Sequence, residues 1–319
     1  MKKKKKYFIS NKKVKWCPGC GNFSILKQIK SILSEIGVKK EKIVFVSGIG
    51  CSSRLPYYLN TFGIHGIHGR APSIATGIKL SNPNLSVWII TGDGDGLSIG
   101  GNHLIHLFRR NINVNILLFN NKIYGLTKGQ YSPTSSFGKK TKYSPLGTIE
   151  RPFNTLSLAL GSGATFVARS IDINTKHLKK MLIESNNHIG TSFLEIYQNC
   201  NIFNNGVFSS FSKKKNKSLY LEQNKPLLFG TKCIVLNNNK IKIKLYNKYI
   251  NNKLWIHDIY NINKAFFLSN FFYEKKYKSF PCPFGVIYKK NIYTYDNIFN
   301  KKNDNFKKIS LDKILSGIK

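Results

Sequence analysis

Hydrophobic and polar positions alternate in blocks along the chain, and the clearest blocks lie near residue 100. An apolar run at residues 87–90 stops at Gly92-Asp93-Gly94-Asp95, and a second run at residues 114–119 stops at Asn120-Asn121. The segment between the two runs has a helical pattern. The blocks therefore predict a strand, a tight turn, a helix and a second strand, with polar residues at the carboxyl ends of both strands.

The remaining apolar runs extend this βαβ unit into a larger α/β domain. Helical spacing predicts a helix that starts after Gly21 and ends near Gly37, and a strand follows at residues 43–46. Further helices are expected to end near residue 78 and to span residues 153–160 and 175–184, and further strands to span residues 165–168 and 192–196. This alternation indicates a mostly parallel sheet with helices on both faces.

Beyond residue 201 the pattern weakens. We expect a basic arm at residues 1–16, the α/β domain at residues 17–211, and a linker with an irregular C-terminal extension at residues 212–319. Within the extension, short strands are expected at residues 233–236, 241–245 and 285–288, and a helix near residues 263–269. A long polar loop at residues 124–147 follows the central unit, and loops of that length are usually functional or disordered.

Composition and charge exclude several classes of protein. Of the 319 residues, 41% are hydrophobic, and no apolar run reaches the roughly 18 residues of a membrane span. The basic start MKKKKKYFIS lacks the apolar stretch of a signal peptide, so we expect a cytoplasmic protein with reduced cysteines. The formal net charge of +37 comes from lysines scattered among asparagine and isoleucine, as AT-rich codons favour, without an aromatic-interleaved basic motif. We therefore expect no nucleic-acid or membrane partner.

The central unit carries candidate metal chemistry. Asp93 offers a hard carboxylate oxygen and Asn121, 28 positions later, a neutral amide oxygen, and both suit Mg²⁺. Glycines 92 and 94 let the backbone approach a bulky anion, and the helix N-terminus that follows favours a diphosphate. A glycine turn and an unrelated loop asparagine are the alternative interpretation. The combination of GDG with NN about thirty residues later is similar to the thiamine-diphosphate motif.

The cysteines suggest a second metal site. Cys17 and Cys20 form a CxxC turn, and Cys51 and Cys200 follow predicted strands of the same sheet. Four thiolates that converge at one edge of the sheet suit a [4Fe–4S] cluster, and zinc is the main alternative. Cys233 and Cys282 lie in the C-terminal extension and are expected to be unligated core thiols.

Six segments together resemble one known family. WCPGCG, GIGCSSR, HGRAPSIATG, GDGDGLSIGGNHLIHLFRRN, FNNKIYGLTKGQYSPTS and EIYQNCNIF occur in this order. The chain resembles the beta subunit of 2-oxoacid:ferredoxin oxidoreductases over about residues 14–230, and most closely the 2-oxoglutarate branch. The basic arm and the lysine-rich tail are departures from that family.

The resemblance implies a role for each matching residue. It implies that the cluster ligands are Cys17, Cys20, Cys51 and Cys200, and that the Mg²⁺ ligands are Asp93, Asn121 and the carbonyl of Ile123. It implies that the thiamine-diphosphate site is lined by Ile49, Gly50, Cys51, Ser52, His68, Gly94, Asp95, Gly125 and Leu126. Finally, it implies that substrates are discriminated at Arg54, Leu126 and Lys128, where a cation would pair with the distal carboxylate of 2-oxoglutarate.

The resemblance also implies a reaction and its partners. A 2-oxoacid, expected to be 2-oxoglutarate, is converted with coenzyme A to succinyl-CoA and CO₂ while ferredoxin is reduced, or the reverse. Thiamine enzymes need a glutamate at the cofactor's pyrimidine ring on a second domain, and none of the seven glutamates here lies in such a domain. We therefore expect an alpha subunit to complete the enzyme. The alternatives are a preference for pyruvate or broad specificity, a non-oxidative thiamine-diphosphate lyase subunit, and a basic nucleic-acid-binding protein.

Overall fold

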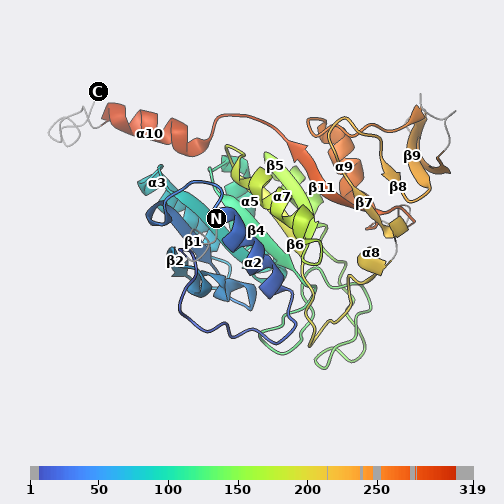
Figure 1. Ribbon diagram of the computed structural model, residues 1–319, viewed down its shortest axis with the longest axis horizontal. Helices are drawn as coiled ribbons and strands as arrows, with labels where there is room; N and C mark the ends of the chain where they lie inside the picture. The colour runs from blue at the N-terminus through green and yellow to red at the C-terminus, as the bar shows by residue number, and fades with distance from the viewer. Residues whose placement is uncertain are drawn as a thin grey trace.

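The structure is a computed structural model in which an α/β core carries a C-terminal extension (Figure 1). It describes residues 7–213, 215–237, 240–246, 253–273, 277 and 279–306. The lysine cluster at residues 2–6 lies outside the described residues. Within the described ranges, none of the helices combines the length and the apolar character that crossing a bilayer requires.

An eight-stranded, mostly parallel sheet forms the centre of the fold. Its strands are β1 (Ile43–Ser47), β2 (Phe62–His65), β3 (Ser86–Gly92), β4 (Asn115–Asn120), β5 (Phe166–Ile171), β6 (Ser192–Tyr197), β7 (Ser218–Tyr220) and β11 (Cys282–Lys289). They lie in the order β2-β1-β3-β4-β6-β5-β11-β7. The pair β5–β11 is antiparallel, whereas β1–β2, β1–β3, β3–β4, β4–β6, β5–β6 and β7–β11 are parallel. A second, three-stranded sheet contains β8 (Leu228–Phe229), β9 (Lys232–Asn237) and β10 (Lys240–Leu245).

Helices cover both faces of the main sheet (Figure 1). The α-helices are α2 (Asn22–Leu33), α3 (Ala71–Ser81), α4 (Asp93–Leu97), α5 (Gly101–Arg110), α6 (Thr155–Gly161), α7 (Thr175–Asn186), α8 (Ser210–Lys213), α9 (Ile262–Asn270) and α10 (Tyr295–Phe306). Short 3-10 helices are η1 (Lys40–Lys42), η2 (Ser52–Tyr58) and η3 (Lys215–Lys217). Apolar residues of α2 and α7 pack on one face, and those of α3, α5, α6 and α9 pack on the other.

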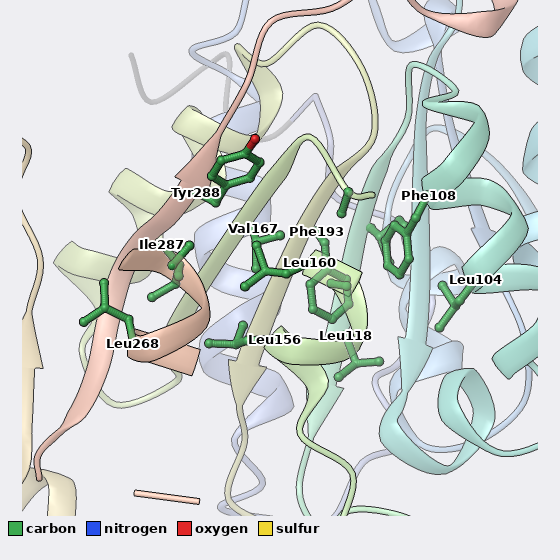
Figure 2. Close-up of a cluster of buried hydrophobic side chains, with 14 of the residues drawn as sticks. Leu104, Phe108, Leu118, Leu156, Leu160, Val167, Phe193, Leu268, Ile287 and Tyr288 are labelled. Atoms are coloured by element: carbon green, nitrogen blue, oxygen red, sulfur yellow. The ribbon is translucent and has the colours of Figure 1, made fainter. Parts of the chain in front are cut away.

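Two apolar clusters, one on each face, explain why the strands are apolar at nearly every position. Side chains of a strand alternate between faces, so Val87 and Ile89 of β3 join one cluster while Trp88 and Ile90 join the other. Figure 2 shows part of the first cluster, where side chains from α5, α6 and α9 meet those of β4, β5, β6 and β11. Full burial of one such side chain contributes about 1.5–3 kcal/mol.

The structure confirms the predicted α/β class, and it differs from the prediction at several places, among them helix α10 and strand β8, which were not predicted. Strand β2 was not predicted: it has only four residues, one of them Gly63, and all four are exposed. The helix after the GDGDG segment is split into α4 and α5. The extension also supplies β7 and β11 to the main sheet, although the expected boundary at residue 211 stays a prediction.

The parallel strands place the carboxyl ends of β1, β3, β4 and β6 along one edge. The loops that follow β4 and β6 project from this edge at the bottom of Figure 1. The strand order reverses beside β1, since β2 lies on one side of it and β3 on the other. In open α/β sheets such a reversal opens a crevice beyond the carboxyl ends, where ligands bind.

Candidate active site

A cavity of about 120 Å³ lies at this edge of the sheet. Its lining includes all nine residues predicted to contact thiamine diphosphate: Ile49, Gly50, Cys51, Ser52, His68, Gly94, Asp95, Gly125 and Leu126. The predicted Mg²⁺ ligands Asp93, Asn121 and Ile123 line the same cavity. The structure therefore brings these residues together, and their contacts with a cofactor stay a prediction.

The carboxylate of Asp95, which is only 3% exposed, organises one wall of the cavity. Its Oδ1 atom accepts hydrogen bonds from the backbone N–H groups of Ile49 (3.0 Å) and Gly69 (2.7 Å), and its Oδ2 atom accepts one from the Thr91 hydroxyl (2.7 Å). A side chain at position 48 has no space, because a Cβ on Gly48 would lie 2.1 Å from Oδ2. One carboxylate thus holds the loop after β1 against the loop after β2.

Asp95 also orients His68. The Nδ1 atom of His68 lies 2.5 Å from Asp95 Oδ1, and the ring is one of the groups that line the cavity. A carboxylate oxygen accepts, so Nδ1 is the donor in this contact, and Nε2 is the ring nitrogen left for a molecule in the cavity.

Asp93 is a buried carboxylate with neutral hydrogen-bond donors. It is 2% exposed, and its Oδ2 atom accepts hydrogen bonds from Ser132 and Thr134, each at 2.6 Å. Burial raises the pKa of Asp93, and the two hydroxyl groups oppose that rise. A cation at this carboxylate would stabilise its ionised form, so the environment suits a metal ligand.

Asn121 and Ile123 form a compact turn after β4. The Oδ1 atom of Asn121 accepts a hydrogen bond from the Ile123 N–H (3.1 Å), and its Nδ2 atom donates one to Gln198 (3.0 Å). Lys122 between them has a positive φ of 57°, and its carbonyl accepts a hydrogen bond from Ser135 (2.8 Å). The loop that follows the strand therefore fixes the direction of the Asn121 amide.

Four residues that contact the predicted site residues were not themselves predicted from the sequence: Tyr124, Ser132, Thr134 and Gln198. The Tyr124 hydroxyl donates to the Gly94 carbonyl (3.0 Å), and a Cβ on Gly94 would lie 2.1 Å from the Tyr124 ring. The ring thus explains the glycine at position 94. Gln198 directly follows a strand, as Asp93 does, and this position was the available signal. The Ser132 and Thr134 hydroxyls lie in a loop without periodicity.

The four cysteines predicted to hold a cluster lie at the same edge as the cavity. Cys17 is exposed, and Cys20, Cys51 and Cys200 are half-buried. Burial, together with the nearby charges of the other three thiols, raises the pKa of Cys20 to about 12. A Cβ on Gly125 would lie 3.6 Å from the Cys51 sulfur and 3.7 Å from the Cys200 sulfur, so two of the sulfurs flank the cavity wall.

The loops that carry these cysteines are joined by hydrogen bonds. The Gly21 N–H donates to the Asn199 carbonyl (3.1 Å), and Asn201 donates to the Pro18 carbonyl. The Trp16 indole donates to the Cys51 carbonyl (2.6 Å). By contrast, Cys233 and Cys282 are fully buried in other parts of the fold, as core thiols.

Arg54 and Lys128 lie outside the lining of the cavity, whereas Leu126 belongs to it. Arg54 donates a hydrogen bond to the Lys15 carbonyl (3.4 Å) and lines a neighbouring depression with Lys12 and Lys13. Burial raises the pKa of Cys51, and the charge of Arg54 opposes part of that rise. Lys128 is exposed in the loop after β4. The predicted role of both cations with substrate stays a prediction.

Comparison with known proteins identifies the family. Residues 48–196 match the family described as "Thiamine pyrophosphate enzyme, C-terminal TPP binding domain". The chain is 51% identical over 260 residues to the 2-oxoglutarate oxidoreductase subunit KorB of Mycobacterium tuberculosis, which covers 80% of this chain and 70% of that protein. It is 36% identical over 253 residues to the 2-oxoglutarate synthase subunit KorB of Methanocaldococcus jannaschii, covering 79% and 89%.

A solved structure is similar over nearly the whole chain. It is the 2-oxoglutarate:ferredoxin oxidoreductase of Magnetococcus marinus with 2-oxoglutarate, coenzyme A and succinyl-CoA bound. The TM-score is 0.80 at 31% sequence identity, and the match covers 99% of this chain and 96% of the other. On these similarities and on the arrangement of its cavity, the chain belongs to the family of 2-oxoacid:ferredoxin oxidoreductase beta subunits.

Proposed function

We propose that this chain is the beta subunit of a cytoplasmic 2-oxoglutarate:ferredoxin oxidoreductase. It would convert 2-oxoglutarate and coenzyme A to succinyl-CoA and CO₂ while ferredoxin is reduced, or run the reverse. The observation that carries the proposal is one cavity that brings together Asp93, Asn121 and the loop at residues 49–52, which includes Cys51, with the Cys200 sulfur next to Gly125 of the same lining. The names of the similar proteins support 2-oxoglutarate as the substrate.

The residues present fit thiamine diphosphate held through Mg²⁺. Asp93, Asn121 and the Ile123 carbonyl would bind the metal ion, since all three are oxygen donors that line one cavity. Gly50 has a φ of +121° and a Cβ there would meet nothing within 4 Å, so its backbone borders open space. When bound, the cofactor supplies the electron sink for decarboxylation of the 2-oxoacid. The chain itself would bind the diphosphate, and the two loops that Asp95 joins by hydrogen bonds would orient the cofactor ring.

The four cysteines fit an iron–sulfur cluster better than a single zinc ion. Each of the other three thiols is close enough to Cys20 to affect its pKa. Yet, in the part of the chain that the structure describes, no three His, Cys, Asp or Glu side chains are close enough to share one ion. In a cluster each thiolate binds a different iron atom, so the sulfurs stand further apart than around zinc, where each Zn–S bond is about 2.3 Å.

The alpha subunit is expected to cover the open side of the cavity. Among the described residues that line the cavity there is no glutamate to activate a pyrimidine ring. Large apolar side chains are exposed on the loops that follow β2 and β4: Ile67 (74%), Leu126 (46%), Phe137 (68%), Leu146 (96%) and Ile149 (85%). A partner on these loops would bury them and exclude water from the reacting groups.

Anaerobic co-expression with an alpha subunit tests the proposal. We expect coenzyme A-dependent ferredoxin reduction with 2-oxoglutarate by the complex and no activity from the chain alone. A complex that decarboxylates the 2-oxoacid without reducing ferredoxin would instead indicate a non-oxidative lyase. Activity of the isolated chain would contradict the need for a partner.

A further inference from the structure

Gln198 lies between the two predicted cofactor sites. It directly follows β6, is 1% exposed and lines the cavity. Its Oε1 atom accepts a hydrogen bond from Asn121 Nδ2 (3.0 Å), and its Nε2 atom donates one to the Cys20 sulfur (3.3 Å). One side chain therefore touches a predicted Mg²⁺ ligand and a predicted cluster ligand at the same time.

Both ends of the Gln198 amide independently fix its orientation. Asn121 Oδ1 already accepts the Ile123 N–H, so the group that Asn121 offers to Gln198 is its NH₂. That group needs an acceptor, which is Oε1 of Gln198. A thiolate at Cys20 is an acceptor as well and needs the opposite, NH₂ end of the same amide. The backbone N–H of Gln198 donates to the Asn120 carbonyl (2.9 Å), which anchors the residue to β4.

Each contact has a defined effect. By holding the NH₂ group of Asn121, Gln198 leaves Oδ1 as the amide atom available to a metal ion, as groups that orient a metal ligand commonly do. At Cys20, a donated hydrogen bond stabilises negative charge on sulfur. Reduction of a cluster adds one negative charge, so donors to its sulfurs raise its reduction potential.

We propose that Gln198 is a positioning residue shared by both sites, which orients Asn121 for Mg²⁺ and raises the reduction potential of the cluster through Cys20. The inference rests on the proposed function, because it assumes that both cofactors bind where the residues above predict. Gln198 is not proposed to touch the substrate. Its role is therefore measured by a potential and a metal affinity instead of by turnover.

The experiment uses the anaerobically reconstituted complex with the alpha subunit. Iron, acid-labile sulfide and bound thiamine diphosphate are first measured in the wild type. Three variants follow. Gln198→Leu removes both contacts together with the hydrogen bond that Nε2 donates to the Asn199 carbonyl. Gln198→Glu keeps an acceptor for Asn121 but removes the donor to Cys20 and adds a negative charge, and Gln28→Leu is the control. Gln28 is also a nearly buried glutamine, on α2 after Cys20, and it takes no part in these contacts. The readouts are the cluster midpoint potential by spectroelectrochemical titration and the Mg²⁺ dependence of thiamine-diphosphate binding.

For Gln198→Leu we expect at least a tenfold shift of the one-electron equilibrium toward the oxidised cluster, which is about 59 mV. Its Mg²⁺ affinity should fall about 10–100-fold. Gln198→Glu should lower the cluster potential and keep the Mg²⁺ affinity near that of the wild type. If Gln198→Leu does not fold, the potential of Gln198→Glu still tests the contact with Cys20. Potentials of both variants equal to that of Gln28→Leu would overturn the inference while leaving the proposed function intact. A wild type without iron and sulfide would overturn both.

Discussion

Replacing Asp95 tests how the walls of the cavity are held. Asp95→Ala leaves the backbone N–H groups of Ile49 and Gly69 without their acceptor. An unsatisfied buried donor costs about 1–3 kcal/mol. Two such donors together give an expected loss of about 2–6 kcal/mol in the free energy of unfolding.

Asp95→Asn separates the hydrogen bonds from the charge. The asparagine oxygen can still accept from Ile49 and Gly69, and its NH₂ group can donate to the Thr91 hydroxyl, which then acts as acceptor. We expect a loss of only about 1 kcal/mol, since charged hydrogen bonds become neutral ones. Urea unfolding of the purified chain measures both losses, and Thr91→Val is the control that removes one bond to Oδ2. Equal losses for the alanine and asparagine variants would refute the argument that Asp95 acts as an acceptor for the two loops.

Other changes test the remaining parts of the site. Cys200→Ser should lose most of the roughly 400 nm absorbance of the reconstituted cluster, whereas Cys282→Ser should keep it, because Cys282 is fully buried in another apolar cluster. Asp93→Ala should abolish Mg²⁺-dependent thiamine-diphosphate binding in titration calorimetry while leaving the circular dichroism unchanged, and retained affinity would contradict the assignment. Arg54→Ala should raise the KM for 2-oxoglutarate much more than that for pyruvate; equal changes would place Arg54 outside the substrate site, in line with its contact with the Lys15 carbonyl. Burial lowers the pKa of His177 from 6.5 to about 4, so its stabilising contribution is present above pH 6.5 and is lost as the pH falls toward 4; thermal unfolding of His177→Gln should depend less on pH across that window.

The closeness of Asp93 and Asn121, the predicted metal ligands, could be inferred from sequence because strand geometry relates them. Strands β3 and β4 are neighbours, and Gly92 pairs with Phe119 in the register. Asp93 and Asn121 therefore follow adjacent strand ends, which the apolar runs alone indicate. The same reasoning placed Cys51 and Cys200 after β1 and β6.

Contacts that depend on loop conformation could not be predicted in this way. Ser132 and Thr134 reach Asp93 from a loop about forty residues later, and nothing periodic in that loop indicates which hydroxyl turns inward. Arg54 lies in η2, a short helix without an apolar pattern that would show its direction. β11 joins the sheet beside β5 more than a hundred residues later, and a pairing of that range leaves no local signal.

The hydrogen bonds between the two cysteine loops have a consequence for synthesis of the chain. Pro18 and Cys20 are held by Asn201 and Gln198, which follow them by 183 and 178 residues. At a translation rate of about 5–20 residues per second, the first loop leaves the ribosome roughly 10–40 s before its partners exist. During that interval the CxxC turn has none of these contacts, so its thiols are open to oxidation and to foreign metals. We therefore expect insertion of the proposed cluster to follow completion of β6 and to act on a chain whose sheet is formed as far as that strand.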